Sequence, residues 1–145
     1  MKLFRGILLC FSTLMAPSVS ASELQPITGA AVDGASETYP LERCAALHFS
    51  MLSYFGESTF DAEHVARVKG FVSSLIAMSV VARKTKTGAS MGLVQEAVHS
   101  DVFAISQLYE ARFKENYAST GQAFGSDPLI KADLSLCEGI AREMG

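Results

Sequence analysis

Residues 94–113 read VQEAVHSDVFAISQLYEARF, and apolar side chains recur along this stretch at intervals of three or four residues. That spacing puts them on one face of an α-helix, whereas a half-buried strand would show strict alternation. The face consists of Val94, Val98, Val102, Ile105, Tyr109 and Phe113. We therefore predict a helix from just after Ser90 to about Tyr117, with this face turned inward.

Three further segments show the same spacing, and we predict helices over residues 40–55, 58–84 and 127–144. Pro40 and the pair Asp127-Pro128 are typical helix starts, because proline fixes φ for the first turn and an aspartate side chain accepts from free backbone amides. No segment alternates as a strand does. The chain is therefore predicted to be all-α, a four-helix up-down-up-down bundle over residues 40–145.

The helix predicted over residues 58–84 is the least polar of the four, and residues 70–82 carry no charge. We expect it at the centre of the bundle, with an inward face from Val65 to Met78. Ala62, Ala66 and Gly70 recur every fourth residue along it, which favours a close helix–helix contact inside the bundle. Self-association through the same row is the alternative.

The first residues match an export signal. Lys2 and Arg5 precede an apolar run over residues 6–19, and Val19 and Ala21 are small residues at the −3 and −1 positions of a cleavage site. We predict a signal peptide over residues 1–21 and a periplasmic or secreted mature protein. Residues 22–39 are rich in small and polar residues and predict a flexible leader. No later segment is expected to form a stable membrane span, because the longest uncharged one has thirteen residues.

The mature chain is acidic. Two of the twelve basic residues and none of the fifteen acidic residues lie in residues 1–21, so the remaining 124 residues have a formal charge of −5. Proteins that bind nucleic acid present a basic face, so we do not expect nucleic acid as a partner.

Two cysteines remain after residue 21, Cys44 and Cys137. Each lies on the apolar face of its predicted helix, near the start of the first helix and toward the end of the last. In an antiparallel pair of neighbouring helices these positions lie at the same level. Because disulfides persist in oxidising compartments, we predict a Cys44–Cys137 disulfide, with two separate buried thiols as the alternative.

Residues 88–92, GASMG, match the G-x-S-x-G pattern of serine hydrolases. That pattern works at a turn from a strand into a helix, and no strand is predicted before it. The chain is also short for a hydrolase sheet. We therefore interpret Ser90 as the N-cap of the following helix and do not expect an enzyme.

The three histidines, His48, His64 and His99, fall on three different predicted helices without the spacing of a metal site. His48 lies on an apolar face and is the first candidate for a ligand-binding or pH-sensitive residue, although a hydrogen-bonded core histidine is the simpler interpretation. We predict no metal and no cofactor. A carrier of a small apolar ligand such as haem is the alternative function.

Phe124 lies in the connection between the last two helices, with glycines at positions 121 and 125. If exposed it would be an anchor for a partner; a side chain that folds back over the end of the bundle is the simpler interpretation. From these features we predict an exported, non-enzymatic, protein-binding or stress-related factor that uses a helix face or this loop.

Overall fold

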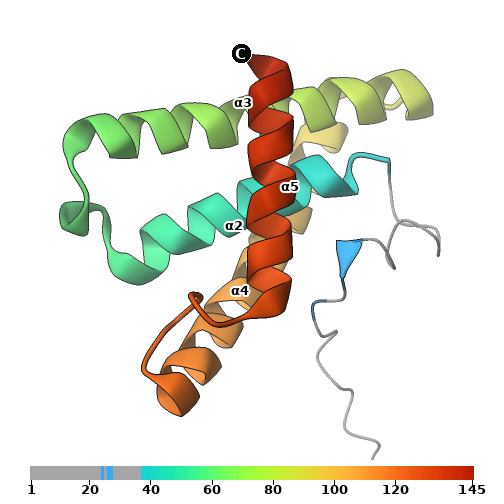
Figure 1. The fold of residues 1–145 in the computed structure, drawn as a ribbon. Helices are drawn as coiled ribbons and strands as arrows, with labels where there is room; N and C mark the ends of the chain where they lie inside the picture. The colour runs from blue at the N-terminus through green and yellow to red at the C-terminus, as the bar shows by residue number, and fades with distance from the viewer. Residues whose placement is uncertain (1–23, 25, 28–36) are drawn as a thin grey trace, which may run out of the picture.

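The computed structural model describes residues 24, 26, 27 and 37–145. The predicted signal peptide and most of the predicted leader lie outside these residues. The described part contains four long helices, and the all-α four-helix prediction is confirmed (Figure 1). They are α2 (Tyr39–Phe55), α3 (Ala62–Thr87), α4 (Met91–Thr120) and α5 (Pro128–Met144), with a 3-10 turn, η1 (Glu57–Thr59), between α2 and α3.

The helix ends follow from caps. Asp61 accepts from the backbone amide of His64, so α3 begins at Ala62 rather than at residue 58, and the preceding residues form η1. Gly88 and Gly121 have φ of +67° and +71° at the C-caps of α3 and α4. Glycine adopts this left-handed conformation without steric cost, so both helices continue three residues beyond their predicted ends.

The centre of the molecule is α2, not the helix predicted over residues 58–84. It packs against α3, α4 and α5, and all of residues 42–47 are buried. In α3 the buried residues are Val72, Leu75, Ser79 and Val80. High hydropathy therefore does not mark the central helix here, because many apolar side chains of α3 are small and remain on the surface.

The inward faces are confirmed in part. The six residues predicted to face inward on α4 are all buried. On α3, Met78 is 43% exposed, whereas its neighbours Ser79 and Val80 are buried, so here the buried face lies one to two residues further along the helix than predicted. Met144, at the end of α5, is 38% exposed.

The row Ala62, Ala66 and Gly70 lies on the exposed side of α3. A Cβ atom added at Gly70 would meet no heavy atom within 4 Å outside its own local backbone. The predicted helix–helix contact inside the bundle is therefore wrong, and this side of α3 is open.

The Cys44–Cys137 disulfide is confirmed. Both cysteines are buried, their Cα atoms are 5.5 Å apart, and 93 positions separate them in the sequence. In Figure 1 α5 crosses α2 at a steep angle, so the two helices meet around the disulfide rather than along their whole lengths. The covalent link thus lies where the last helix contacts the central one.

At least three described residues of the predicted leader belong to the folded part, and one of them, Tyr39, is the first residue of α2 and packs against the core. Leu24 is 6% exposed and lies in the hydrophobic core. Thr38 is buried, and its hydroxyl donates to Glu42 Oε1 at 2.6 Å.

By length and composition α3 satisfies the criteria for a helix that crosses a membrane, with a mean hydropathy of 1.6 over its most apolar window. Core helices of soluble proteins satisfy the same criteria, although only 28% of this window is buried. The absence of a membrane span in the mature chain stays a prediction.

Candidate functional site

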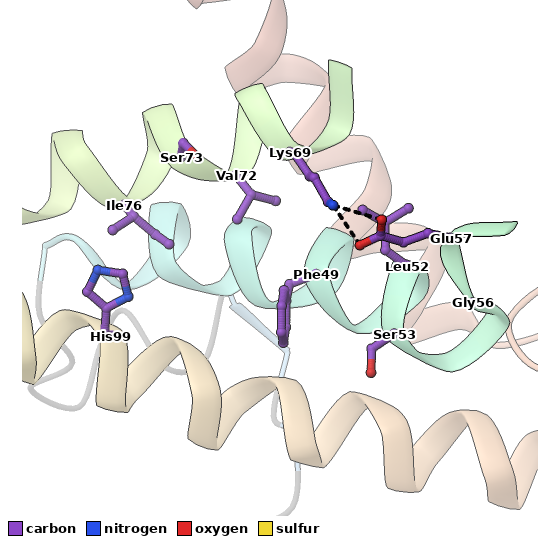
Figure 2. Close-up of a pocket in the computed structure, with 10 residues that line it drawn as sticks. All are labelled: Phe49, Leu52, Ser53, Gly56, Glu57, Lys69, Val72, Ser73, Ile76 and His99. Atoms are coloured by element: carbon purple, nitrogen blue, oxygen red, sulfur yellow. Dashed lines mark hydrogen bonds and ion pairs between the residues drawn. The ribbon is translucent and has the colours of Figure 1, made fainter. Parts of the chain in front are cut away.

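A groove lies between α2, α3 and α4 and extends to the turn after α2 (Figure 2). Its volume is about 640 Å³, within the range of about 300–1,000 Å³ that is typical of ligand sites. It is lined by Phe49, Leu52, Ser53, Gly56, Glu57, Lys69, Val72, Ser73, Ile76 and His99. Sequence periodicity did not indicate this groove, because it depends on how three helices splay apart.

The groove has a mainly apolar lining that also includes Ser53, Ser73 and His99, and it carries a charged pair at one end. Leu52 and Val72 are buried in its floor, and Ile76 is half-buried. At the charged end Lys69 Nζ lies 2.7 Å from a carboxylate oxygen of Glu57, an exposed ion pair drawn in Figure 2. A ligand with an apolar surface fits this lining better than a charged one.

Two phenylalanines stand out around the groove because they are exposed. Phe49, which lines it from α2, is 44% exposed. Phe103 is 60% exposed on α4, one helical turn after the lining residue His99 and therefore on the same side of that helix. Each of these side chains leaves a large apolar area uncovered.

His48, the first ligand candidate from the sequence, does not line the groove. Its Nδ1 lies 3.0 Å from the carbonyl oxygen of Cys44, and its ring packs edge-to-face on Phe71 with centroids 5.1 Å apart. Burial lowers the pKa of His48 below its ordinary value. The geometry is that of a hydrogen-bonded histidine at the edge of the core.

The histidines do not form a metal site. His64 stacks on Phe60, with ring centroids 5.2 Å apart, and His99 lies in the groove. Among the described residues, no group of three or more histidine, cysteine, aspartate or glutamate side chains is placed to hold a metal ion.

Phe124 and Ser90 both have structural roles in the described part of the chain. Phe124 is half-buried and packs edge-to-face against Phe55 and Phe113, with ring centroids 5.7 and 6.4 Å apart. It therefore covers the end of the bundle, as the simpler interpretation holds. Ser90 Oγ accepts from the backbone amide of Leu93 at 3.5 Å as the N-cap of α4.

A buried polar cluster lies beside the disulfide and was missed from the sequence. Arg43 Nη2 donates to Asp133 Oδ2 at 2.7 Å, and the hydroxyl of Tyr109 donates to the same oxygen at 2.6 Å. Arg43 is fully buried and Asp133 is 2% exposed. Burial alone would lower the pKa of Arg43, but interactions with Tyr109 and Asp133 outweigh it and raise the pKa. The cluster is closed to solvent, so its role is to join α2, α4 and α5.

The sequence did contain a signal for this cluster. Asp133 follows Ile130 by three residues and precedes Cys137 by four, so it lies on the apolar face of its helix. Arg43 precedes Cys44 directly. A charged residue on a buried face requires an opposite charge nearby, and the neighbouring cysteines already pair the two helices.

A second ion-pair cluster fixes α3 to α2 and α4. Arg83 pairs with buried Glu42 and, at 2.6 Å, with Asp101 Oδ2. Burial would lower the pKa of Arg83, but hydrogen bonds to Asp101 and Glu42 raise it further than burial lowers it. The orientation of α3 in the fold is therefore set by charges as well as by packing.

Asp127 combines the N-cap of α5 with an ion pair. Its Oδ1 accepts from the amide of Leu129, and its Oδ2 accepts from Arg112 at 2.6 Å and from Asn116 at 2.7 Å. Burial would raise the pKa of Asp127, but the hydrogen bonds from Arg112 and Asn116 lower it from 3.8 to about 2. The folded state therefore prefers the ionised carboxylate.

Asp127 is expected to make the free energy of unfolding depend on pH in the acidic range. Because its pKa is lower in the folded than in the unfolded state, its contribution of about 2 kcal/mol is complete above pH 5 and is lost as the pH falls through 3.8 toward 2. Asp127→Asn keeps the cap and removes the charge. Urea unfolding should show the difference between wild type and variant shrinking by about 1 kcal/mol between pH 5 and pH 3. A constant difference would contradict this assignment.

No family model, characterised protein or solved structure matches this chain.

Proposed function

We propose that this protein is an exported, non-enzymatic binding protein that holds an apolar segment of a partner protein in the groove between α2, α3 and α4. The single observation that carries the proposal is the exposure of Phe49 at the groove, where a large aromatic side chain remains uncovered. Phe103, still more exposed one turn from His99, extends the apolar surface.

The shape of the groove favours a helical segment as the bound part. Three helices form its walls, its floor is apolar, and one side is open to solvent. An amphipathic helix can place one apolar face in such a groove while its polar face stays in water. Because the mature chain is acidic, a partner with positive charges beside that apolar face would be favoured.

Export is part of the proposal. It is supported by the signal-peptide pattern over residues 1–21, and the Cys44–Cys137 disulfide suggests an oxidising compartment. Mass measurement of the protein from its natural source is expected to show a chain that begins at Ser22. A full-length chain retained in the cytosol would contradict export.

A photo-crosslinking residue at position 49 tests the binding surface. We expect it to form adducts with a small set of exported proteins in the natural host, whereas the same residue at Tyr117, a 60% exposed aromatic position toward the other end of α4, should not. Binding of the purified partner should then fall at least tenfold in Phe49→Asp and stay unchanged in Tyr117→Asp. Equal adducts at both positions, or unchanged binding by Phe49→Asp, would overturn the proposal.

The small-ligand carrier stays the alternative because the groove has a suitable volume. His48, the first ligand candidate from the sequence, packs against Phe71 outside the groove. His99 is the histidine that lines it. Absorption spectroscopy with added haem separates the two functions: a shift that is lost in His99→Ala would favour the carrier.

A further inference from the structure

The side of α3 that faces away from α2 has no partner among the described residues. Along it run six uncharged, exposed residues, which we call the outer seam: Ala66, Gly70, Ser73, Ser74, Ala77 and Val81. Ser73 lies at the edge of this seam, because it also lines the groove. Val81 is 59% exposed, and the neighbouring Met78 is 43% exposed. Glu63 lies at one end of the seam and Lys84 at the other, both exposed.

We propose that the outer seam binds a second copy of this protein, with the two α3 helices antiparallel about a twofold axis between Ser73 and Ser74. A twofold contact requires a surface that is complementary to itself. With that axis, Glu63 of one copy lies opposite Lys84 of the other, and the reverse pair forms at the far end. The sequence positions between them match in the same way, Gly70 opposite Ala77 and Ala66 opposite Val81.

The side chains on the seam permit close approach of the two helices. Gly70 has open space where a Cβ would lie, and its neighbours along the seam are alanine and serine. Small residues at a crossing let helix axes come to the short end of the range of about 8–10 Å. Contact would also cover Val81, which is more exposed than Met78, the other exposed large apolar side chain of α3.

The charges at the ends favour a second copy over other occupants. Glu63 already pairs with Arg67 in an exposed contact, and its side chain is 84% exposed, so it can accept a second cation. For Lys84 no ion pair is found among the described residues. A reversed copy supplies an opposite charge at both ends at once. A lipid surface would also suit the apolar seam, and Lys84 and Lys86 lie at one end of it, but Asp61 and Glu63 place negative charge at the other end, which an anionic lipid surface would repel.

The fold holds α3 in place for this contact. Leu75 is fully buried on the opposite side, and Arg83 is fixed by Glu42 and Asp101. The seam is therefore presented on a rigid helix. Since one helix pair covers less than the 1,200–2,000 Å² of a standard interface, we expect a dimer that dissociates at roughly micromolar concentrations and weakens with salt.

Charge reversal tests the pairing. Sedimentation of the oxidised mature protein between 1 and 200 µM should show a concentration-dependent dimer. Glu63→Lys and Lys84→Glu should each weaken it at least tenfold by placing like charges opposite each other. An equimolar mixture of the two variants, and the double variant, should regain wild-type association. The control Lys114→Glu, at an exposed position on α4, should have no effect.

Close approach is tested by Gly70→Leu. The monomer has room for this side chain, and leucine favours helix more than glycine, so the melting temperature should not fall. The dimer should be lost. A wild-type monomer at 200 µM, or a dimer that resists every variant, would overturn the proposal. Sedimentation with phosphatidylglycerol vesicles that is lost in Gly70→Asp would assign the seam to lipid instead.

The groove and the outer seam are tested separately. Crosslinking from position 49 should persist in Lys84→Glu, and dimerisation should persist in Phe49→Asp. If one of these two proposals fails its test, the other proposal is unaffected.

Discussion

Replacing both Cys44 and Cys137 with alanine is expected to lower the free energy of unfolding by about 4–5 kcal/mol. The disulfide closes a loop across 93 sequence positions, and a link of this span removes much conformational freedom from the unfolded chain. Because a domain of this size has a total stability of about 5–15 kcal/mol, the variant should be close to unfolding at 37 °C. No other described link joins α2 and α5 covalently.

Guanidinium unfolding followed by circular dichroism measures this loss. Adding a reductant to the wild-type protein should move its transition to that of the double variant, and the same reductant should leave the variant unchanged. A transition that does not move on reduction would show that the disulfide does not stabilise the fold.

Asp133→Ala is expected to be the most damaging single substitution, with a loss of about 3–5 kcal/mol. It leaves the guanidinium of Arg43 buried without its carboxylate, and it removes the acceptor of Tyr109. The exposed Glu138, on the same helix, is the matched control, and Glu138→Ala should change stability by less than about 0.5 kcal/mol. Thermal and denaturant unfolding of the oxidised proteins give both values.

The stability loss from removing the disulfide and the loss from Asp133→Ala should not be additive. Asp133 and Cys137 are one turn apart on α5, and their partners Arg43 and Cys44 are adjacent on α2, so both links hold the same helix contact. Once α5 has separated from α2, removing the second link costs little. A double-mutant cycle should therefore give a coupling energy of at least about 1 kcal/mol. Strict additivity would mean that the links stabilise separate regions.

Regular apolar spacing predicted the helices and the disulfide well. The inward face of α4, from Val94 to Phe113, follows one period for five turns, and the structure buries all of it. Cys44 and Cys137 were paired because two periodic faces placed them at the same level. The inward face of α4 is a property of a single helix, and the disulfide is a property of one pair of helices. Periodicity carries information about features of this kind.

The position of α3 and the binding groove were not predictable in the same way. Hydropathy put the helix over residues 58–84 at the centre, yet the central helix is α2, which buries Glu42 and Arg43 among apolar neighbours. A charged residue lowers hydropathy but is buried readily when its partner is fixed on another helix. The groove arises from the angles among three helices, which no single segment encodes.

The disulfide has a consequence for how the protein matures. Under the proposed removal of residues 1–21, Cys44 and Cys137 are the only cysteines left, so the chain then has a single intramolecular way to oxidise, whereas four cysteines would allow three pairings. Maturation then requires only an electron acceptor and no enzyme that reshuffles mismatched bonds. A host that oxidises thiols but lacks an isomerase should still yield the native product.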